Sequence, residues 1–391
     1  MSVAVTQHRL GRALAAYLVV LIGVVTLVPF RFHWPVAFHL TGFTTVGDLV
    51  ENVALFVPLG FFIAFSRRGH PVLVGFLLSL GVESLQQFIP GRFSSPLDLL
   101  TNLAGAWLGG WCFRWAAESI SRRQCEIGVM ALDLPLMGLV YLLLPLLWLS
   151  GLAAGGDPGR GWLVALPGIT MAVVIASVGR HALAPRGVLP VVTALAAGVA
   201  MMHGLIPGWF ADPLFVVAAS GLLVAAVMVF GELLTRGEPQ GRRFELPTVE
   251  RALVPFGVYL LLVALWPFPF EVAAWRGTVA FGASVERLGQ VGILRMLELL
   301  AGATFVGYAF AELRGRQDES TLRQRMVALA TGLAVAGVLV VVRGWHPRYG
   351  ASLVEAVLLV LATGFGAVLY WRHRAYVQAV LGVGSERPGS A

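Results

Sequence analysis

Long runs of apolar residues recur along the whole chain, and short segments rich in arginine, glycine or proline separate them. A helix needs about 20 predominantly apolar residues to cross the hydrocarbon core of a bilayer. Runs of roughly this length predict an all-α, polytopic helical bundle with about 12 transmembrane helices. The expected spans are 12–30, 48–66, 71–89, 96–116, 129–150, 162–180, 188–206, 213–235, 252–268, 289–313, 323–343 and 351–372.

Composition supports this pattern and excludes a soluble globular protein. Hydrophobic residues make up 58% of the chain and charged residues only 13%, with a mean hydropathy of +0.81. An ordinary soluble domain carries about 25% charged residues. The net charge of +7 comes from arginines spread between the apolar runs. We therefore expect the lipid bilayer, and no nucleic acid, as a partner.

The distribution of arginines predicts the orientation. Clusters such as Arg67/Arg68, Arg122/Arg123 and Arg242/Arg243 fall in alternate connections. Because positively charged loops stay in the cytoplasm, both termini are expected there. The first apolar run has no small-residue cleavage signal after it, which favours a retained helix. We expect a multi-pass protein of the bacterial cytoplasmic (inner) membrane.

The spans group into three blocks of four helices, at 1–123, 124–246 and 247–391. The first and last blocks look related, since Glu51 has a counterpart in Glu298. The stretch from Pro90 to Gly109 also matches Pro347 to Gly366 at a constant offset of 257 residues. The middle block has few buried acids and is expected to serve for packing.

Acids, amides and one arginine interrupt the apolar helices of the first block. The set comprises Asp48, Glu51, Asn52, Glu83, Gln86, Arg92, Asp98 and Asn102. In the predicted orientation, three helices present these groups at one depth below the outer surface. Arg92, in a short loop between two helices, is the expected counter-charge. Residues three or four positions apart share a helix face, so we expect Glu83 beside Gln86 and Asp98 beside Asn102.

Two interpretations of this polar cluster compete. It is a satisfied network that fixes the register of the helices, or it lines an outward-facing pocket for a polar or cationic group. Ionisable residues within a membrane are costly, which favours the functional interpretation. A pair of carboxylates such as Glu83 and Asp98 also suits acid–base chemistry if their environments separate their pKa values.

Other chemistry has little support in the sequence. Cys112 and Cys125 lack histidines at metal-ligand spacing, so neither a metal site nor a disulfide framework is predicted. The chain has no phosphate-binding loop, HExxH helix or GxSxG elbow. We expect no cofactor, and the sequence identifies no catalytic residue.

The spacing of the polar residues resembles the VanZ-like family over about residues 10–116. The motifs are Asp48-x-x-Glu51-Asn52-x-x-x-Phe56-x-Pro58-Leu59-Gly60, Glu83-x-x-Gln86, Pro90-Gly91-Arg92, and Asp98-x-x-x-Asn102-x-x-Gly105-Ala106-x-x-Gly109. A degenerate second copy covers about 252–372. It keeps Glu298 and Glu355 but lacks counterparts of Glu83 and Gln86, and it has Arg295 where Asp48 would be.

The resemblance implies a bacterial membrane protein of the cell envelope, in a family named from a member linked to teicoplanin resistance. The leading hypothesis is a pocket that binds an amphiphilic or lipid-linked envelope compound, with a role in resistance to lipoglycopeptide antibiotics. The alternatives are a secondary transporter or flippase of an envelope precursor, and a membrane enzyme acting on an outer-leaflet lipid head group. The sequence leaves the ligand and the oligomeric state open.

Overall fold

The computed structural model describes residues 2–27, 30–34, 46–91, 94–122, 136–183, 245–268, 273–279, 282–314, 321–347 and 349–380. The chain divides into two compact units. One consists of residues 1–133 and 372–391, and the other of residues 134–371.

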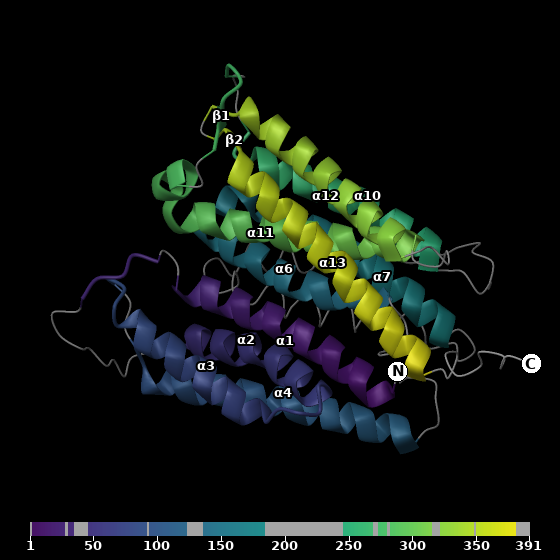
Figure 1. Cartoon of the computed structure of the whole chain (residues 1–391). Coiled ribbons are helices and arrows are strands. Elements are labelled where there is room, and N and C mark those ends of the chain that lie inside the picture. The colour runs from purple at the N-terminus through teal and green to yellow at the C-terminus, as the bar shows by residue number, and fades with distance from the viewer. Residues whose placement is uncertain are drawn as a thin grey trace, which may run out of the picture. The chain divides into compact units, whose positions relative to one another are not determined.

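The first unit is built on four helices that lie side by side in Figure 1. They are α1 (Val3–Leu27), α2 (Val46–Phe65), α3 (Pro71–Gln86) and α4 (Pro96–Arg122). Phe56 and Leu59 of α2 and Ala106 of α4 are fully buried between helices. Leu73 and Leu77 of α3, by contrast, are more than half exposed, as expected for a face that meets lipid chains.

The second unit contains the remaining helices of the described chain. They are α6 (Leu136–Gly156), the 3-10 helix η1 (Pro158–Val164), α7 (Ala165–Leu183), α10 (Glu245–Leu265), α11 (Gly282–Arg314), α12 (Thr321–Gly344) and α13 (Leu353–Val380). From Arg372 onward, α13 belongs to the first unit. The two-residue strands β1 (Gly277–Thr278) and β2 (Ala351–Ser352) pair in parallel beside the start of α13 (Figure 1).

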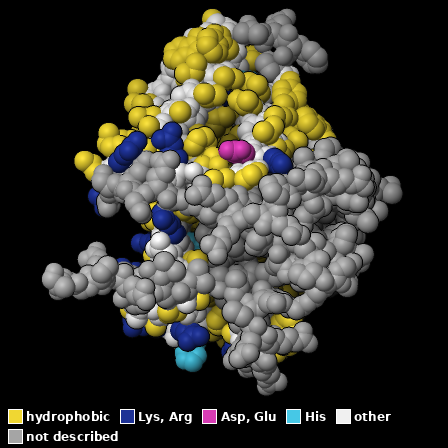
Figure 2. Space-filling view, turned by 90° about the vertical axis from the view of Figure 1, so that its right-hand side faces the viewer, with side chains coloured by type: hydrophobic (Ala, Val, Ile, Leu, Met, Phe, Trp, Pro, Cys, Tyr) yellow, Lys and Arg dark blue, Asp and Glu magenta, His cyan; other side chains and the backbone are white. Residues whose placement is uncertain are grey.

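The described helices suit a membrane. Seven are long and apolar enough to cross one, and two shorter apolar segments accompany them. Hydrophobic side chains also make up most of the described surface in Figure 2, with few acidic groups among them. An all-α membrane protein, as predicted, is therefore confirmed.

Ten of the twelve predicted spans each coincide with one helix, from α1 to α13. The spans predicted at 188–206 and 213–235 lie outside the described residues. The total of twelve spans, the orientation and the three-block division therefore remain predictions.

Helices α2 and α4 approach closely because each carries a glycine at the crossing. A Cβ atom at Gly60 would collide with the carbonyl oxygen of Ala106, and one at Gly109 with the carbonyl oxygen of Val57. Phe61 and Phe113 then meet edge to face, with ring centroids 5.5 Å apart. Small residues that let backbones approach are the usual device for helix association in membranes.

The same crossing recurs between α11 and α13. A Cβ at Gly307 would meet the carbonyl oxygen of Thr363, and one at Gly366 that of Thr304. Tyr308 and Tyr370 also meet edge to face, with centroids 5.5 Å apart. Every α11 position here lies 247 residues after its α2 equivalent, and every α13 position 257 residues after its α4 equivalent.

Candidate functional site

The predicted polar residues that the structure describes gather at the end of the first unit where α2 and α4 begin and α3 ends. Four of them, Asp48, Glu51, Glu83 and Asp98, form what we call the carboxylate cluster. Asp48 lies in the first turn of α2 and Asp98 in the first turn of α4. The charge of Asp48 acts on both Glu51 and Asp98, and the charge of Asp98 acts on Glu83. The cluster therefore spans three helices.

Glu83 connects α3 to the start of α4. Its Oε2 atom accepts a hydrogen bond from the main-chain N–H of Ser95, at 3.0 Å. The hydroxyl of Ser94 donates in turn to the main-chain carbonyl of Glu83, at 2.5 Å. These bonds fix the carboxylate beside the α4 N-terminus, where unpaired main-chain N–H groups favour negative charge.

Asp98 lies between α2 and α4. The side-chain amide of Asn52 is hydrogen-bonded to its carboxylate. Its Oδ1 atom is buried and has no hydrogen-bond partner. One carboxylate oxygen is thus left to accept a bond from a further group.

The amides bond across helices rather than to the acid on their own helix. Gln86 donates from Nε2 to the main-chain carbonyl of Thr26 in α1, at 3.1 Å. Asn102 donates from Nδ2 to the hydroxyl of Ser79 in α3, at 2.9 Å, while its buried Oδ1 lacks a partner. The expected pairs Glu83–Gln86 and Asp98–Asn102 therefore share a face without bonding to each other.

Arg92, the expected counter-charge, lies outside the described residues. Among the residues that the structure does describe, Glu51, Glu83 and Asp98 form no ion pair. No group of three or more metal-binding side chains occurs in that part of the chain either. Half-buried carboxylates that have no ion-pair partner among the described residues suit a ligand that brings its own positive charge or hydrogen-bond donors.

The corresponding end of α10–α13 keeps two acids, Glu298 and Glu355, but adds buried arginines. There Arg295, in α11, donates from Nη2 to the main-chain carbonyl of Ala264 near the end of α10. Ala264 is the equivalent of Thr26 in α1, whose main-chain carbonyl accepts the hydrogen bond from Gln86. Arg343 forms a buried ion pair with Glu355 of α13. These four helices therefore carry Arg295 where the first four carry Asp48, and they pair a retained acid with Arg343.

Sequence reasoning missed a buried ion pair in the second unit. Arg160 of η1, which falls between the spans predicted at 129–150 and 162–180, is only 1% exposed and lies 2.6 Å from Glu298. Tyr259 of α10 donates a hydrogen bond to the other carboxylate oxygen of Glu298, at 2.9 Å. Glu298 was recognised as the counterpart of Glu51, but nothing in the local pattern distinguishes Arg160 from an exposed loop arginine.

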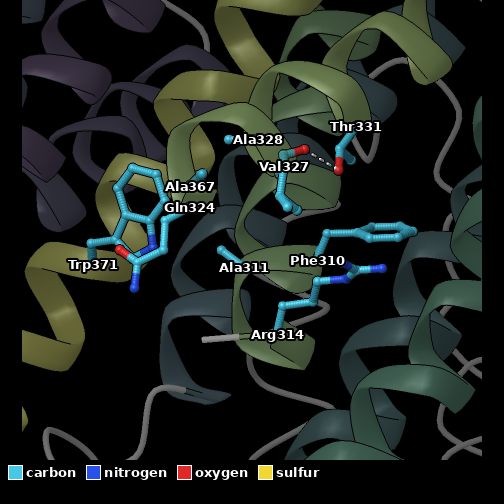
Figure 3. A pocket seen from close by; sticks show the side chains of 10 residues that line it. Phe310, Ala311, Arg314, Gln324, Val327, Ala328, Thr331, Ala367 and Trp371 are labelled. Atoms are coloured by element: carbon cyan, nitrogen blue, oxygen red, sulfur yellow. Dashed lines mark hydrogen bonds between the residues drawn. The ribbon is translucent and has the colours of Figure 1, made fainter. Parts of the chain in front are cut away.

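A separate hollow lies at the opposite end of α11 and carries no acid among its lining residues (Figure 3). Phe310 and Arg314 of α11, Gln324 and Val327 of α12, and Trp371 of α13 are among the residues that line it. Its apolar wall suits contact with lipid chains, and it offers no set of groups for chemistry.

Comparison with known proteins supports the resemblance drawn from the motifs. Residues 5–117 match the model of the VanZ/LLP1 family. The matched region contains α2, α3, most of α1 and α4, and the whole carboxylate cluster. No curated protein and no solved structure matches the chain. The N-terminal four-helix region is therefore VanZ-like, as predicted.

Proposed function

We propose that the VanZ-like region binds the polar or cationic head of an amphiphilic or lipid-linked compound of the cell envelope, in a pocket formed by the carboxylate cluster. In this proposal the protein lies in the bacterial inner membrane with both termini in the cytoplasm. A role in resistance to teicoplanin-type lipoglycopeptides is one consequence that the family suggests.

One observation carries the proposal. Glu51, Glu83 and Asp98 lie together at one end of three helices and form no ion pair with a described residue. Like charges so close repel each other, and their partial burial adds to the cost. A positively charged or hydrogen-bond-donating head group relieves both costs.

Two side-chain oxygen atoms without hydrogen-bond donors also support a bound head group. Asn102 Oδ1 and Asp98 Oδ1 are buried and have no hydrogen-bond partner, and the whole Asn102 residue is only 4% exposed. A buried acceptor left unpaired is unfavourable. Ammonium or hydroxyl groups on a ligand would supply the missing donors.

We also propose that α10–α13 are a degenerate second copy of α1–α4. The paired glycine crossings, the edge-to-face rings and the shared carbonyl acceptor support a duplication, because they recur at constant offsets. The exchange of Asp48 for Arg295 indicates that the copy no longer binds the same group.

Two alternatives use the same residues for another purpose. Transport fits the internal repeat, which many secondary transporters share. However, the carboxylates gather at one end of the helices, whereas transporter sites lie near the midplane. Catalysis on a lipid head group would use Glu83 and Asp98 as acid and base.

The variants Glu83→Gln and Asp98→Asn separate these functions. Each removes a charge while keeping the size of the side chain, and Glu250→Gln, on the exposed face of α10, is the matched control. Loss of glycopeptide protection with an unchanged lipid profile supports binding. Accumulation of a precursor lipid supports catalysis, and reduced uptake into proteoliposomes supports transport. If the expression level, the glycopeptide protection, the lipid profile and the uptake into proteoliposomes all equal those of Glu250→Gln, the cluster only fixes the register of the helices.

A further inference from the structure

The second unit contains a buried cluster of arginines that has no equivalent among the described residues of the VanZ-like region. Arg295 of α11 and Arg343 of α12 are 3% and 4% exposed. Both guanidinium groups approach the ring of Tyr349, with Cζ atoms 3.9 Å and 5.1 Å from its centroid. Two buried cations therefore converge on one aromatic ring.

The described side chains do not balance this charge. Glu298 is paired with Arg160, and Glu355 with Arg343. Arg295 forms no ion pair among the described residues. Because the protein interior disfavours an uncompensated charge, a further negative group near Arg295 is favoured.

The hydrogen bonds of the two arginines are also incomplete. A guanidinium group has five N–H donors in one plane. Arg295 uses Nη2 on the carbonyl of Ala264, but its buried Nε and Nη1 have no partner. The Nε of Arg343 is likewise buried and unpaired. The face of Tyr349 stabilises positive charge but offers no lone pair to these in-plane donors.

We propose that Arg295 and Arg343 hold a phosphate group between them. Phosphate oxygens match the Nε and Nη donors of arginine in a bidentate arrangement. A single negative charge also neutralises the excess positive charge of the cluster. Carbonyls of the loop that carries Tyr349 accept hydrogen bonds from Arg276, which fixes the ring beside the site.

The surrounding aromatic residues favour a lipid as the source of the phosphate. Trp275 and Trp345 flank the same end of α12 and are 50% and 45% exposed. Phe268, just beyond α10, is 41% exposed. Exposed tryptophans gather where the membrane meets water, which is the level of lipid head groups. A phosphodiester of a phospholipid or a lipid-linked precursor lies at that depth.

The test is a titration of the purified full-length protein in phosphate-free detergent, followed by native mass spectrometry and tryptophan fluorescence. The probes are short-chain phosphatidylglycerol, the matching diacylglycerol, and inorganic phosphate. We expect saturable binding of phosphatidylglycerol and none of diacylglycerol. Arg295→Gln should weaken binding about tenfold or more. Arg325→Gln, an exposed arginine of the same helix as Arg343, should leave it unchanged.

One further variant guards against misfolding. Arg295→Lys keeps the charge but loses the planar fork, so binding should weaken less than in Arg295→Gln. Equal affinity for inorganic phosphate would assign the group to a soluble source. The proposal is overturned if the wild-type protein binds neither phosphate probe, or if Arg295→Gln and Arg325→Gln weaken binding equally.

Discussion

The carboxylate of Glu83 accepts a hydrogen bond from the main-chain N–H of Ser95, with 3.0 Å between Oε2 and nitrogen. This bond joins the end of α3 to the residue before α4 and places a negative group at the start of that helix. The hydroxyl of Ser94 closes the same link from the other side. Glu83 thus has a structural bond as well as a charge.

These two properties of Glu83 can be separated. Glu83→Gln retains an acceptor for Ser95 and should change the thermal unfolding midpoint in detergent little. Glu83→Ala removes the acceptor and should cost about 1 kcal/mol. Equal stability of the two variants would show that the bond to Ser95 contributes nothing.

The glycine crossings make the clearest prediction about packing. Gly109→Ala and Gly366→Ala should each destabilise their own crossing by about 1–3 kcal/mol or prevent assembly, because a Cβ would meet the backbone of the facing helix. Gly81→Ala and Gly364→Ala have open space around the new Cβ and serve as matched controls. Thermal unfolding in detergent measures the difference. A tolerated Gly366→Ala together with a damaging Gly109→Ala would contradict equivalent crossings.

The ion pair of Arg160 and Glu298 should be costly to break from one side only. Glu298→Gln leaves a buried guanidinium unpaired and should lower stability by about 3–5 kcal/mol. The double variant Arg160→Met/Glu298→Leu should recover most of that loss, since both charges are gone. A double-mutant cycle on purified protein measures the coupling, and additive losses would indicate that the pair does not interact.

His346, in the loop after α12, should make the second unit sensitive to acid. Burial lowers the pKa of His346 below its ordinary value, and Arg295 and Arg343 lower it further, although the carbonyl of Pro267, 2.8 Å from Nε2, opposes them. The unfolded chain therefore binds the proton more readily than the folded protein. Stability from this group is complete above about pH 6.5 and declines as the pH falls below it.

The variant His346→Gln tests that dependence because it keeps a donor for Pro267 but cannot titrate. Its thermal unfolding midpoint should fall less between pH 7 and pH 5.5 than that of the wild type, because this pH range spans the ordinary histidine pKa of about 6.5. His70→Gln, at an exposed position before α3, should leave the wild-type dependence unchanged. An identical pH dependence in His346→Gln would refute the role of His346.

Hydropathy predicted the helices well because apolar runs of membrane length leave the backbone few alternatives. It misplaced their ends, however. Helix α1 begins at Val3 rather than near residue 12, and α13 continues to Val380 rather than 372. A hydropathy window reports the part of a helix that can lie in lipid, whereas the helix itself continues through polar residues.

The site was only partly predictable for a related reason. Helix spacing placed Asp98 and Asn102 on one face, but it could not show that Asn102 bonds to Ser79 on another helix. The partners of Arg160 and Arg295 also come from distant segments, at Glu298 and Ala264. Such contacts depend on how helices cross, which one sequence without its fold does not specify.

The central claim is that the carboxylate cluster binds a positively charged head group. The most direct measurement is the affinity of the purified protein in nanodiscs for a long-chain alkylamine and for its uncharged N-acetyl derivative. We expect saturable binding of the amine alone, weakened about tenfold in Glu83→Gln and in Asp98→Asn but not in Glu250→Gln. Equal affinity for the amine and its acetylated form, or binding unaffected by both cluster variants, would contradict it.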